Sequence, residues 1–388
     1  MEMNSIVSIA AVVYVIGVCL AMRMNAMSPQ GRVMPISVGG RMEKSLRKSF
    51  VPESWKSKWL IGLFFISLPL VPNLAWSAQP TVRIAQAVDA LAFLPIYVAR
   101  ANGYFNDEGI TLELIIVQGG GPDLQALIAG SVDFDATSTG GLLRTFSGGI
   151  ELLGIHNVVG KCIIDLIIRQ ETAKRLGITP AMPVQEKLRR IKGTIVGASR
   201  VGSLSYQIAY FLAKEAGLEQ GKDVTILGVG GGDSALAALK TGKIDIMSFA
   251  PPFPQVALKG GDAVSLVANS KGEYPKLNSF LQNVLLTRPD YARKNPDMVR
   301  RILRAMVRGN RWVAENDAKE VAKVVSKFFK NTPADVLLNT VEAIKPAVVP
   351  DGRLTLDGLK GVEEVYRANG IIKKPVPWDR LVTNEFLP

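Results

Sequence analysis

Along most of the chain after residue 80, two patterns of hydrophobic positions alternate. Short apolar runs are followed by segments whose apolar residues recur every three or four positions, which is the spacing of one helix face. In the stretch from Gly193 to Ala216, Thr194 to Ala198 is predicted as a buried strand, Ser203 to Ala216 as a helix, and Gly217 as its end. The apolar face of that helix comprises Leu204, Ile208, Phe211 and Leu212. The pattern predicts an α/β protein built from strand–loop–helix units.

The same series of elements occurs twice. The segment Leu124-x-Ala-Leu-x-x-Gly-x-Val-Asp, which ends at Asp133, is matched by Leu236-x-Ala-Leu-x-x-Gly-x-Ile-Asp, which ends at Asp245. In both copies a strand and a glycine run precede this segment, and the first part of the segment is predicted as a helix. Two copies are too few for a solenoid. We therefore expect two similar lobes, each a mostly parallel sheet flanked by helices, with a ligand cleft at the C-terminal ends of the strands.

The repeat and the composition define five expected segments. They are an N-terminal extension (1–41), a signal peptide (42–77), the first part of lobe one (81–170), lobe two (184–262), and a return to lobe one with C-terminal helices (263–388). Glu151 to His156 and Cys162 to Arg169 are predicted as strands between the two copies, and Val284 to Thr287 as a strand that crosses back to lobe one.

The N-terminal region has the composition of a secretory signal. Trp59 to Val71 is an apolar run preceded by several Lys and Arg residues, and Ala75-Trp76-Ser77 provides small residues around a cleavage point near Ser77 or Ala78. The alternative is a membrane anchor, but the run is short and contains Pro69. Upstream, Ile6 to Ala21 is a second apolar run. Either the native start is Met42 or this run is a short membrane segment. We expect a periplasmic mature protein.

Charge and cysteine content exclude several classes of function. The formal charge is +12, and Met1 to Ser77 holds eight Lys/Arg against three Asp/Glu, so +7 remains on the rest of the chain. The surplus is spread out rather than clustered, so nucleic-acid binding is not supported. After processing only Cys162 remains, and His156 is the one histidine, so we expect neither an intramolecular disulfide nor a metal site nor a cofactor.

The loops that follow the predicted strands are the candidate ligand site. In lobe one they span Asp89 to Leu94 and Thr137 to Gly140, and in lobe two Ser199 to Ser203 and Phe249 to Phe253. Hydroxyls, helix N-termini and aromatic rings suit a small organic anion. The candidate residues are Asp89, Phe93, Leu94, Ser138, Thr139, Ser199, Val201, Gly202, Ser203, Phe249 and Pro251. For each the alternative is a helix cap or a core position.

Catalytic patterns are scarce. No nucleophile elbow or Walker loop occurs, and Gly228-x-Gly-Gly-Gly fails as a dinucleotide loop because Asp233 replaces the last glycine. The equivalent positions of Asp133 and Asp245 in the repeat predict a shared structural role rather than acid/base chemistry. We predict no catalytic residue.

Four segments resemble a known family. They are Pro95 to Ile110, Gly119 to Phe134, Gly197 to Ser203 and Asn295 to Arg300. These segments look like those of periplasmic substrate-binding proteins of ABC importers, in the subgroup that binds nitrate, sulfonates, taurine and thiamine-pyrimidine precursors. The resemblance implies a type II periplasmic-binding-protein fold that closes on its ligand by a hinge. It also implies delivery to an ABC permease with a cytoplasmic ATPase subunit, and we expect a monomer.

The same fold is found in a fungal thiamine-pyrimidine synthase, which makes an enzyme the alternative. That enzyme resemblance requires an active-site histidine and a cysteine-rich motif, and here only His156 and Cys162 are available. We therefore expect a binding protein rather than an enzyme.

Fractionation tests the export prediction. The mature chain should be found in the periplasm and begin within a residue or two of Ala78, because a signal peptidase removes the preceding segment. Intact-mass and N-terminal sequencing measure this start. A cytosolic protein that begins at Met1 or Met42 would refute it.

Overall fold

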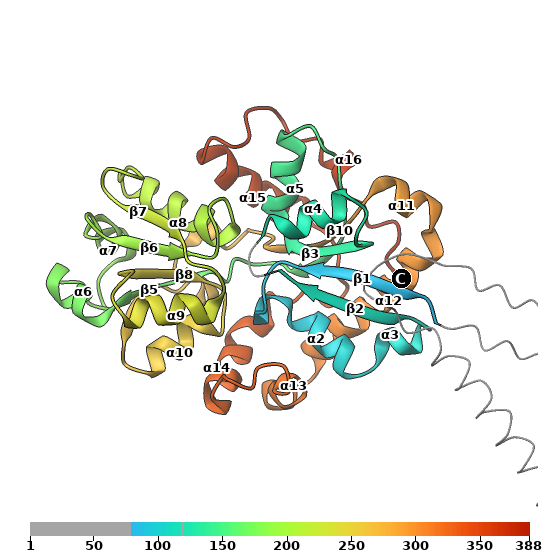
Figure 1. Ribbon diagram of the computed structural model, residues 1–388, viewed down its shortest axis with the longest axis horizontal. Helices are drawn as coiled ribbons and strands as arrows, with labels where there is room; N and C mark the ends of the chain where they lie inside the picture. Colours follow the sequence, from blue (N-terminus) through green and yellow to red (C-terminus); the bar gives the residue numbers. More distant parts are fainter. Residues whose placement is uncertain (1–78, 118–119) are drawn as a thin grey trace, which may run out of the picture. The chain divides into compact units, whose positions relative to one another are not determined.

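The computed structural model describes residues 79–117 and 120–388. The predicted signal peptide, its cleavage point and the upstream apolar run lie outside the described residues. The described chain contains two five-stranded sheets with helices packed against them (Figure 1).

The first sheet has the strand order β2-β1-β3-β10-β4. Strands β1 and β2 pair in parallel, as do β1 and β3, whereas β10 is antiparallel to both of its neighbours. The strands are β1 (Thr81–Gln86), β2 (Thr111–Ile116), β3 (Phe134–Ser138), β4 (Leu153–Val159) and β10 (Asn283–Thr287).

The second sheet repeats this topology in the order β7-β6-β8-β5-β9. Here β6 is parallel to β7 and β8, and β5 is the strand that runs against its neighbours. The strands are β5 (Asp165–Arg169), β6 (Ile195–Ala198), β7 (Thr225–Gly228), β8 (Ile246–Phe249) and β9 (Ala263–Val267). Four of the five strands in each sheet share one direction, so the prediction of two mostly parallel sheets is confirmed.

The expected lobe boundaries differ from the observed strand pairing at two points. The repeat predicts lobe one for residues 81–170 and a return to it for 263–388, but β5 and β9 both pair in the second sheet. The chain crosses between the sheets immediately before β5, and it crosses back after β9. Each sheet thus receives its antiparallel strand from a chain that has just crossed. The strand β10 returns to the first sheet, as predicted.

The helix predicted from Ser203 to Ala216 is observed as α8 (Leu204–Glu215), with Ser203 as its N-cap. The helices between the strands are η1 (Leu91–Phe93), α2 (Leu94–Ala101), α3 (Tyr104–Asp107), α4 (Pro122–Ile128), α5 (Thr139–Ser147), α6 (Gln170–Leu176), α7 (Val184–Arg189), α8 (Leu204–Glu215), α9 (Gly232–Lys240), α10 (Phe253–Lys259), η2 (Asn269–Lys271) and η3 (Pro275–Leu277). The C-terminal set is α11 (Pro289–Lys294), α12 (Pro296–Glu315), α13 (Ala318–Val325), α14 (Ala334–Ile344), η4 (Lys345–Ala347), α15 (Leu356–Ala368) and α16 (Trp378–Leu381). Across residues 79–117 and 120–388, no helix combines the length and apolar character that a membrane crossing requires.

The two repeat aspartates play the same structural role. The Asp133 carboxylate accepts a hydrogen bond from the Arg83 N–H at 2.9 Å, and the Asp245 carboxylate accepts one from the Ile195 N–H at 3.0 Å. Arg83 and Ile195 lie on β1 and β6, which are equivalent strands of the two sheets. Each aspartate therefore fixes the turn before the third strand of its lobe to the first strand, which confirms the predicted shared role.

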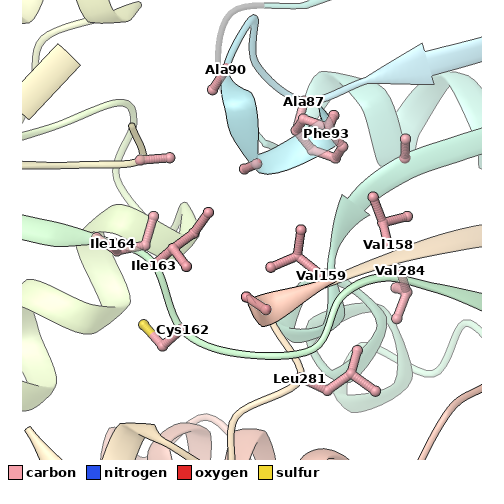
Figure 2. Packing of buried hydrophobic residues seen from close by; sticks show 14 of the residues in the cluster. Ala87, Ala90, Phe93, Val158, Val159, Cys162, Ile163, Ile164, Leu281 and Val284 are labelled. Atoms are coloured by element: carbon pink, nitrogen blue, oxygen red, sulfur yellow. The ribbon is translucent and has the colours of Figure 1, made fainter. Parts of the chain in front are cut away.

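The two crossing segments are hydrogen-bonded to each other. Figure 2 shows the first of them, which carries Cys162, Ile163 and Ile164 from β4 to β5. The Ile163 N–H donates to Gln282 Oε1 at 2.7 Å, and Asn269 Nδ2 donates to the Ile164 carbonyl at 2.6 Å. Both partners, Gln282 and Asn269, belong to the returning segment between β9 and β10.

Asp165, at the start of β5, completes this junction. Its carboxyl group accepts hydrogen bonds from the Ser270 N–H (2.9 Å), the Ser270 hydroxyl (2.8 Å) and Gln255 Nε2 (2.8 Å). Burial raises the pKa of this carboxyl to about 6, although the bonds from Ser270 and Gln255 act to lower it. The neutral form is therefore favoured in the folded state relative to the unfolded chain.

The raised pKa of Asp165 predicts a pH dependence of stability. The folded protein binds the proton more tightly than the unfolded chain, so this stabilisation is complete below pH 4 and is lost as the pH rises through about 6. The loss is of the order of 3 kcal/mol. Asp165→Asn should remove this decline, because Gln255 Oε1 has no partner among the described residues and can accept from the new amide. Urea denaturation between pH 4 and 7 measures the free energy of unfolding of the unmodified protein and of Asp165→Asn. If the two free energies change with pH in parallel, Asp165 is not the group responsible for the decline.

Candidate ligand-binding cavity

A cavity of about 940 Å³ is lined by residues of both sheets and their loops. The first sheet contributes the loops after β1 and β3, and the second the loops after β6, β7 and β8. Both sets lie at the C-terminal ends of parallel strands, where open α/β sheets bind ligands. Six of the predicted site residues line this cavity: Asp89, Phe93, Ser138, Ser199, Ser203 and Phe249.

Five predicted residues do not line the cavity. Leu94 and Thr139 begin α2 and α5 and are fully buried, so they pack inside the first lobe. Val201 is 71% exposed at the tip of its loop, and Gly202 next to it adopts φ +80°. Pro251 uses its carbonyl to accept the Leu91 N–H at 3.0 Å, across the cleft between the lobes. The position of a loop at the end of a strand predicts where a site lies, but it does not predict which side chains point into that site.

The polar groups of the predicted site loop from Ser199 to Ser203, which leads into α8, largely hydrogen-bond to each other. The Ser203 hydroxyl donates to the Arg200 carbonyl at 2.7 Å and accepts the Tyr206 N–H as the N-cap. The Ser205 hydroxyl accepts the Ser199 N–H at 3.0 Å and lies 3.2 Å from the Ser199 hydroxyl. The proton of Ser203 is thus used internally, whereas either hydroxyl of the Ser199–Ser205 pair can be the donor between them.

A second helix N-terminus at the cavity lacks such a cap. Helix α9 begins after Gly230 and Gly231, and its N-cap Gly231 provides no side-chain hydrogen bond. Gly230, Gly231 and Gly232 all line the cavity. Free N–H groups at a helix N-terminus favour negative charge. From the sequence, this glycine run is predicted only as part of the repeat and not as part of the ligand site. The sequence feature that could have indicated a site here is a helix start with no Ser, Thr or Asp in the capping position.

An aromatic group closes the cavity on the side of the first lobe. Tyr97 of α2 lies 5.2 Å from the ring of Phe328 and 5.1 Å from that of Phe329. Its hydroxyl donates to Asp89 Oδ1 at 2.5 Å and accepts from Gln86 Nε2 at 2.7 Å. Burial and the Asp89 carboxylate raise the pKa of Tyr97 well above its ordinary value. Both phenylalanines lie between α13 and α14. They are far along the chain from Tyr97, and no local pattern in the sequence predicts this contact.

In the second lobe, the ring of Phe253 rests on the glycine run. A Cβ built on Gly232 would come within 2.3 Å of three Phe253 ring atoms. The ring can therefore occupy this position only because Gly232 has no side chain. Phe253 also makes an edge contact with Phe249 at 6.4 Å between ring centroids. All three residues line the cavity.

Five charged side chains line the cavity. Arg100, Lys327 and Lys330 are cationic, whereas Asp89 and Asp233 are acidic. Within the described parts of the chain none of the five forms an ion pair, although Arg100 lies 5.3 Å from the centroid of the Phe328 ring. The cavity wall therefore carries a small excess of positive charge.

The two residues of the enzyme alternative lie outside the cavity wall. His156 is fully buried in β4, with Nε2 3.2 Å from Asn310 Oδ1, and burial lowers its pKa to about 4. Cys162 is fully buried, and burial raises its pKa to about 12, which keeps the thiol neutral. A neutral thiol is a poor nucleophile. Among residues 79–117 and 120–388 no group of three or more His, Cys, Asp and Glu side chains is placed to hold a metal ion.

The two mixed sheets, the two crossings and the shared cavity define the periplasmic-binding-protein fold, as the solved structures confirm. The alkanesulfonate-binding protein SsuA from Xanthomonas axonopodis, bound to MOPS, aligns with a TM-score of 0.63 at 18% identity, over 79% of this chain and 99% of that one. The nitrate-binding protein NrtA from Synechocystis also aligns with a TM-score of 0.63, at 14% identity, over 79% of this chain and 86% of its own. The desulfurization enzyme DSZB has the fold too, with a TM-score of 0.53 at 17% identity, over 79% and 97% of the two chains.

The chain belongs to the NMT1/THI5-like family, which it matches over residues 91–320. Among curated proteins, YtlA of Bacillus subtilis, whose name describes it as a binding protein, is 20% identical over 340 residues. That alignment covers 85% of this chain and 97% of YtlA. The resemblance to substrate-binding proteins of ABC importers is confirmed by the family and by these structural neighbours.

Ser203 provides a test of the α8 side of the cavity. Ser203→Asp should weaken anion binding by tenfold or more, because it adds a negative charge to the cavity wall. Ser203→Asn is the matched control, since Asn and Asp cap helices about equally well and differ here in charge. Calorimetric titration of both variants measures the difference. Equal affinities would remove this loop from the binding site.

Proposed function

We propose that the protein is an extracytoplasmic solute-binding protein that captures a small organic anion between its two lobes and delivers it to an ABC importer. The observation that supports this most strongly is the cavity itself, because loops from both sheets line it and the uncapped N-terminus of α9 reaches it. A ligand in this position contacts both lobes at once, as capture between lobes requires.

The cavity wall favours an organic anion over an inorganic one such as nitrate. A volume of about 940 Å³ is at the upper end of the range for sites that hold drug-sized ligands. Six aromatic side chains line it, and the cationic side chains of Arg100, Lys327 and Lys330 outnumber the two acidic ones. Sulfonates and carboxylates with an apolar body combine both requirements. The alkanesulfonate specificity in the name of SsuA is consistent with this choice.

The location and partners follow from the same proposal. The predicted signal peptide supports a periplasmic mature protein. We propose that it acts as a monomer. Its partners are an ABC permease and the ATPase subunit of that importer, since neighbours with this fold serve as ligand-binding components of ABC import systems. A net positive charge without a basic cluster supports no role in nucleic-acid binding.

The alternative function is a thiamine-pyrimidine-synthase-like enzyme. DSZB is an enzyme, so the fold itself permits catalysis. Two observations favour binding over catalysis. Neither His156 nor Cys162 is among the residues that line the cavity, and the burial of both holds them in their neutral forms.

A melting-shift screen tests the proposal. We expect at least one compound among sulfonates, aromatic carboxylates, nitrate and pyrimidines to stabilise the purified protein. A hundredfold excess over the dissociation constant contributes about 2.7 kcal/mol. Mass spectrometry of the recovered ligand is the control, and it should show the compound unchanged. Chemical turnover of any member of the panel would establish the enzyme alternative instead.

A further inference from the structure

We propose that residues 327–332, which join α13 to α14, form a gate through which small molecules enter the cavity while the two lobes stay together. The rings of Phe328 and Phe329 hold this gate segment shut by packing against Tyr97. The inference goes beyond the proposed function, from which it takes only the cavity as the place of the ligand.

The gate segment is part of the outer wall of the cavity. All six of its residues line the cavity. Three of them, Lys327, Lys330 and Asn331, are also exposed to solvent, so no second layer of protein covers them. An outward movement of this one segment therefore opens the cavity to solvent.

The two ends of the gate segment are anchored to different lobes. On one side α13 packs against α2 of the first lobe, and on the other α14 packs against α10 of the second (Figure 1). The ion pair of Lys259 with Asp335 adds to the second anchor, because Asp335 lies in the first turn of α14. The segment thus bridges two fixed points and can bow outward between them without separating the lobes.

The hydrogen bonds of the gate segment are all local. Its backbone bonds are donated by Phe328, Phe329 and Thr332 at 2.9 to 3.1 Å, and all of them end on carbonyls within residues 325–329. In the described parts of the chain, no hydrogen bond or ion pair joins the segment to any element other than α13. Regions with few long-range bonds open locally at a low free-energy cost.

Ring contacts therefore provide the main restraint on the gate. The ring centroids of Phe328 and Phe329 lie 5.2 Å and 5.1 Å from that of Tyr97, and Arg100 lies 5.3 Å from that of Phe328. Tyr97 is itself fixed, because its hydroxyl donates to Asp89 at 2.5 Å. Phe328 is half-buried, so its removal weakens the restraint without leaving a large hole in the core.

A cysteine inside the cavity can report the opening of the gate. Ser199 lines the cavity from the second lobe and is 5% exposed, and Ser199→Cys replaces only an oxygen by a sulfur. The native Cys162 is fully buried, so the unmodified protein should not react. The probe is N-ethylmaleimide, a neutral thiol reagent, and intact-mass spectrometry measures its rate of addition. At low reagent concentration this rate follows the fraction of molecules in which the cavity is open.

Phe328→Ala, made together with Ser199→Cys, is the decisive variant. It should raise the labelling rate at least fivefold, because the open form becomes more populated. Tyr291→Ala is the matched control, since it removes a ring that packs 5.4 Å from Phe134 and does not line the cavity. Labelling should then stay within twofold of Ser199→Cys alone. Melting temperatures verify that each variant is folded.

A variant at a contact between the lobes separates the gate from an opening of the whole cleft. Asn369→Ala removes two hydrogen bonds to Gln207 that join α15 to α8. Because the gate opens without separating the lobes, this variant should label within twofold of Ser199→Cys alone.

Three outcomes would overturn the inference. If Phe328→Ala labels no faster than Ser199→Cys alone, the rings do not hold a gate. If Asn369→Ala accelerates labelling as much as Phe328→Ala does, the cavity opens by separation of the lobes. If the introduced thiol reacts as fast as a free thiol in solution, the cavity is open without the gate. Each of these results leaves the proposed function standing, because that function is tested separately by the melting-shift screen.

Discussion

The buried junction between the two crossing segments is the constraint on which the two-lobed arrangement depends. The chain leaves the first sheet after β4 and returns to it at β10. At the point where the two segments meet, Ile163, Ile164 and Asp165 hydrogen-bond to Gln282, Asn269 and Ser270. The polar groups in this apolar setting are costly unless they are paired. Their pairing holds the two crossing segments together, and Ile164 and Gln282 of these segments also line the cavity.

Much of the fold could be predicted because it depends on local patterns that occur twice. The periodicity of Leu204, Ile208, Phe211 and Leu212 is enough to identify a helix, and the matching segments ending at Asp133 and Asp245 are enough to identify a second lobe. The partner of each strand was less accessible. β5 and β9 have the composition of any buried strand. No pattern within their own residues predicts which of the two sheets they join. Their pairing depends on where the chain crosses, which is a long-range property.

The candidate cavity shows the same division. Loops after parallel strands predict its position, and six of the predicted side chains line it. The directions of Leu94 and Thr139 follow from packing inside the first lobe, which the sequence does not show. Phe328 and Phe329 reach Tyr97 only because α13 packs against α2. The glycine run before α9 was visible in the sequence, but its meaning depends on the absence of a cap and on the ring of Phe253.

The hydrogen-bonded crossings also determine how far different parts of the molecule travel if one lobe turns against the other. Such a turn has to take place about the paired segments, so displacement grows with distance from them, as along a lever arm. Gln282 and Asn269 move least. The bond from Leu91 to Pro251, the ion pair of Lys259 with Asp335 and the bond from Asn369 to Gln207 join the lobes away from that axis. Lys214 Nζ, which donates to the Ala368 carbonyl at 2.7 Å, is a fourth contact of this kind. A turn of one lobe changes the distances across these four contacts more than those at the crossings, so they are suitable positions for distance labels.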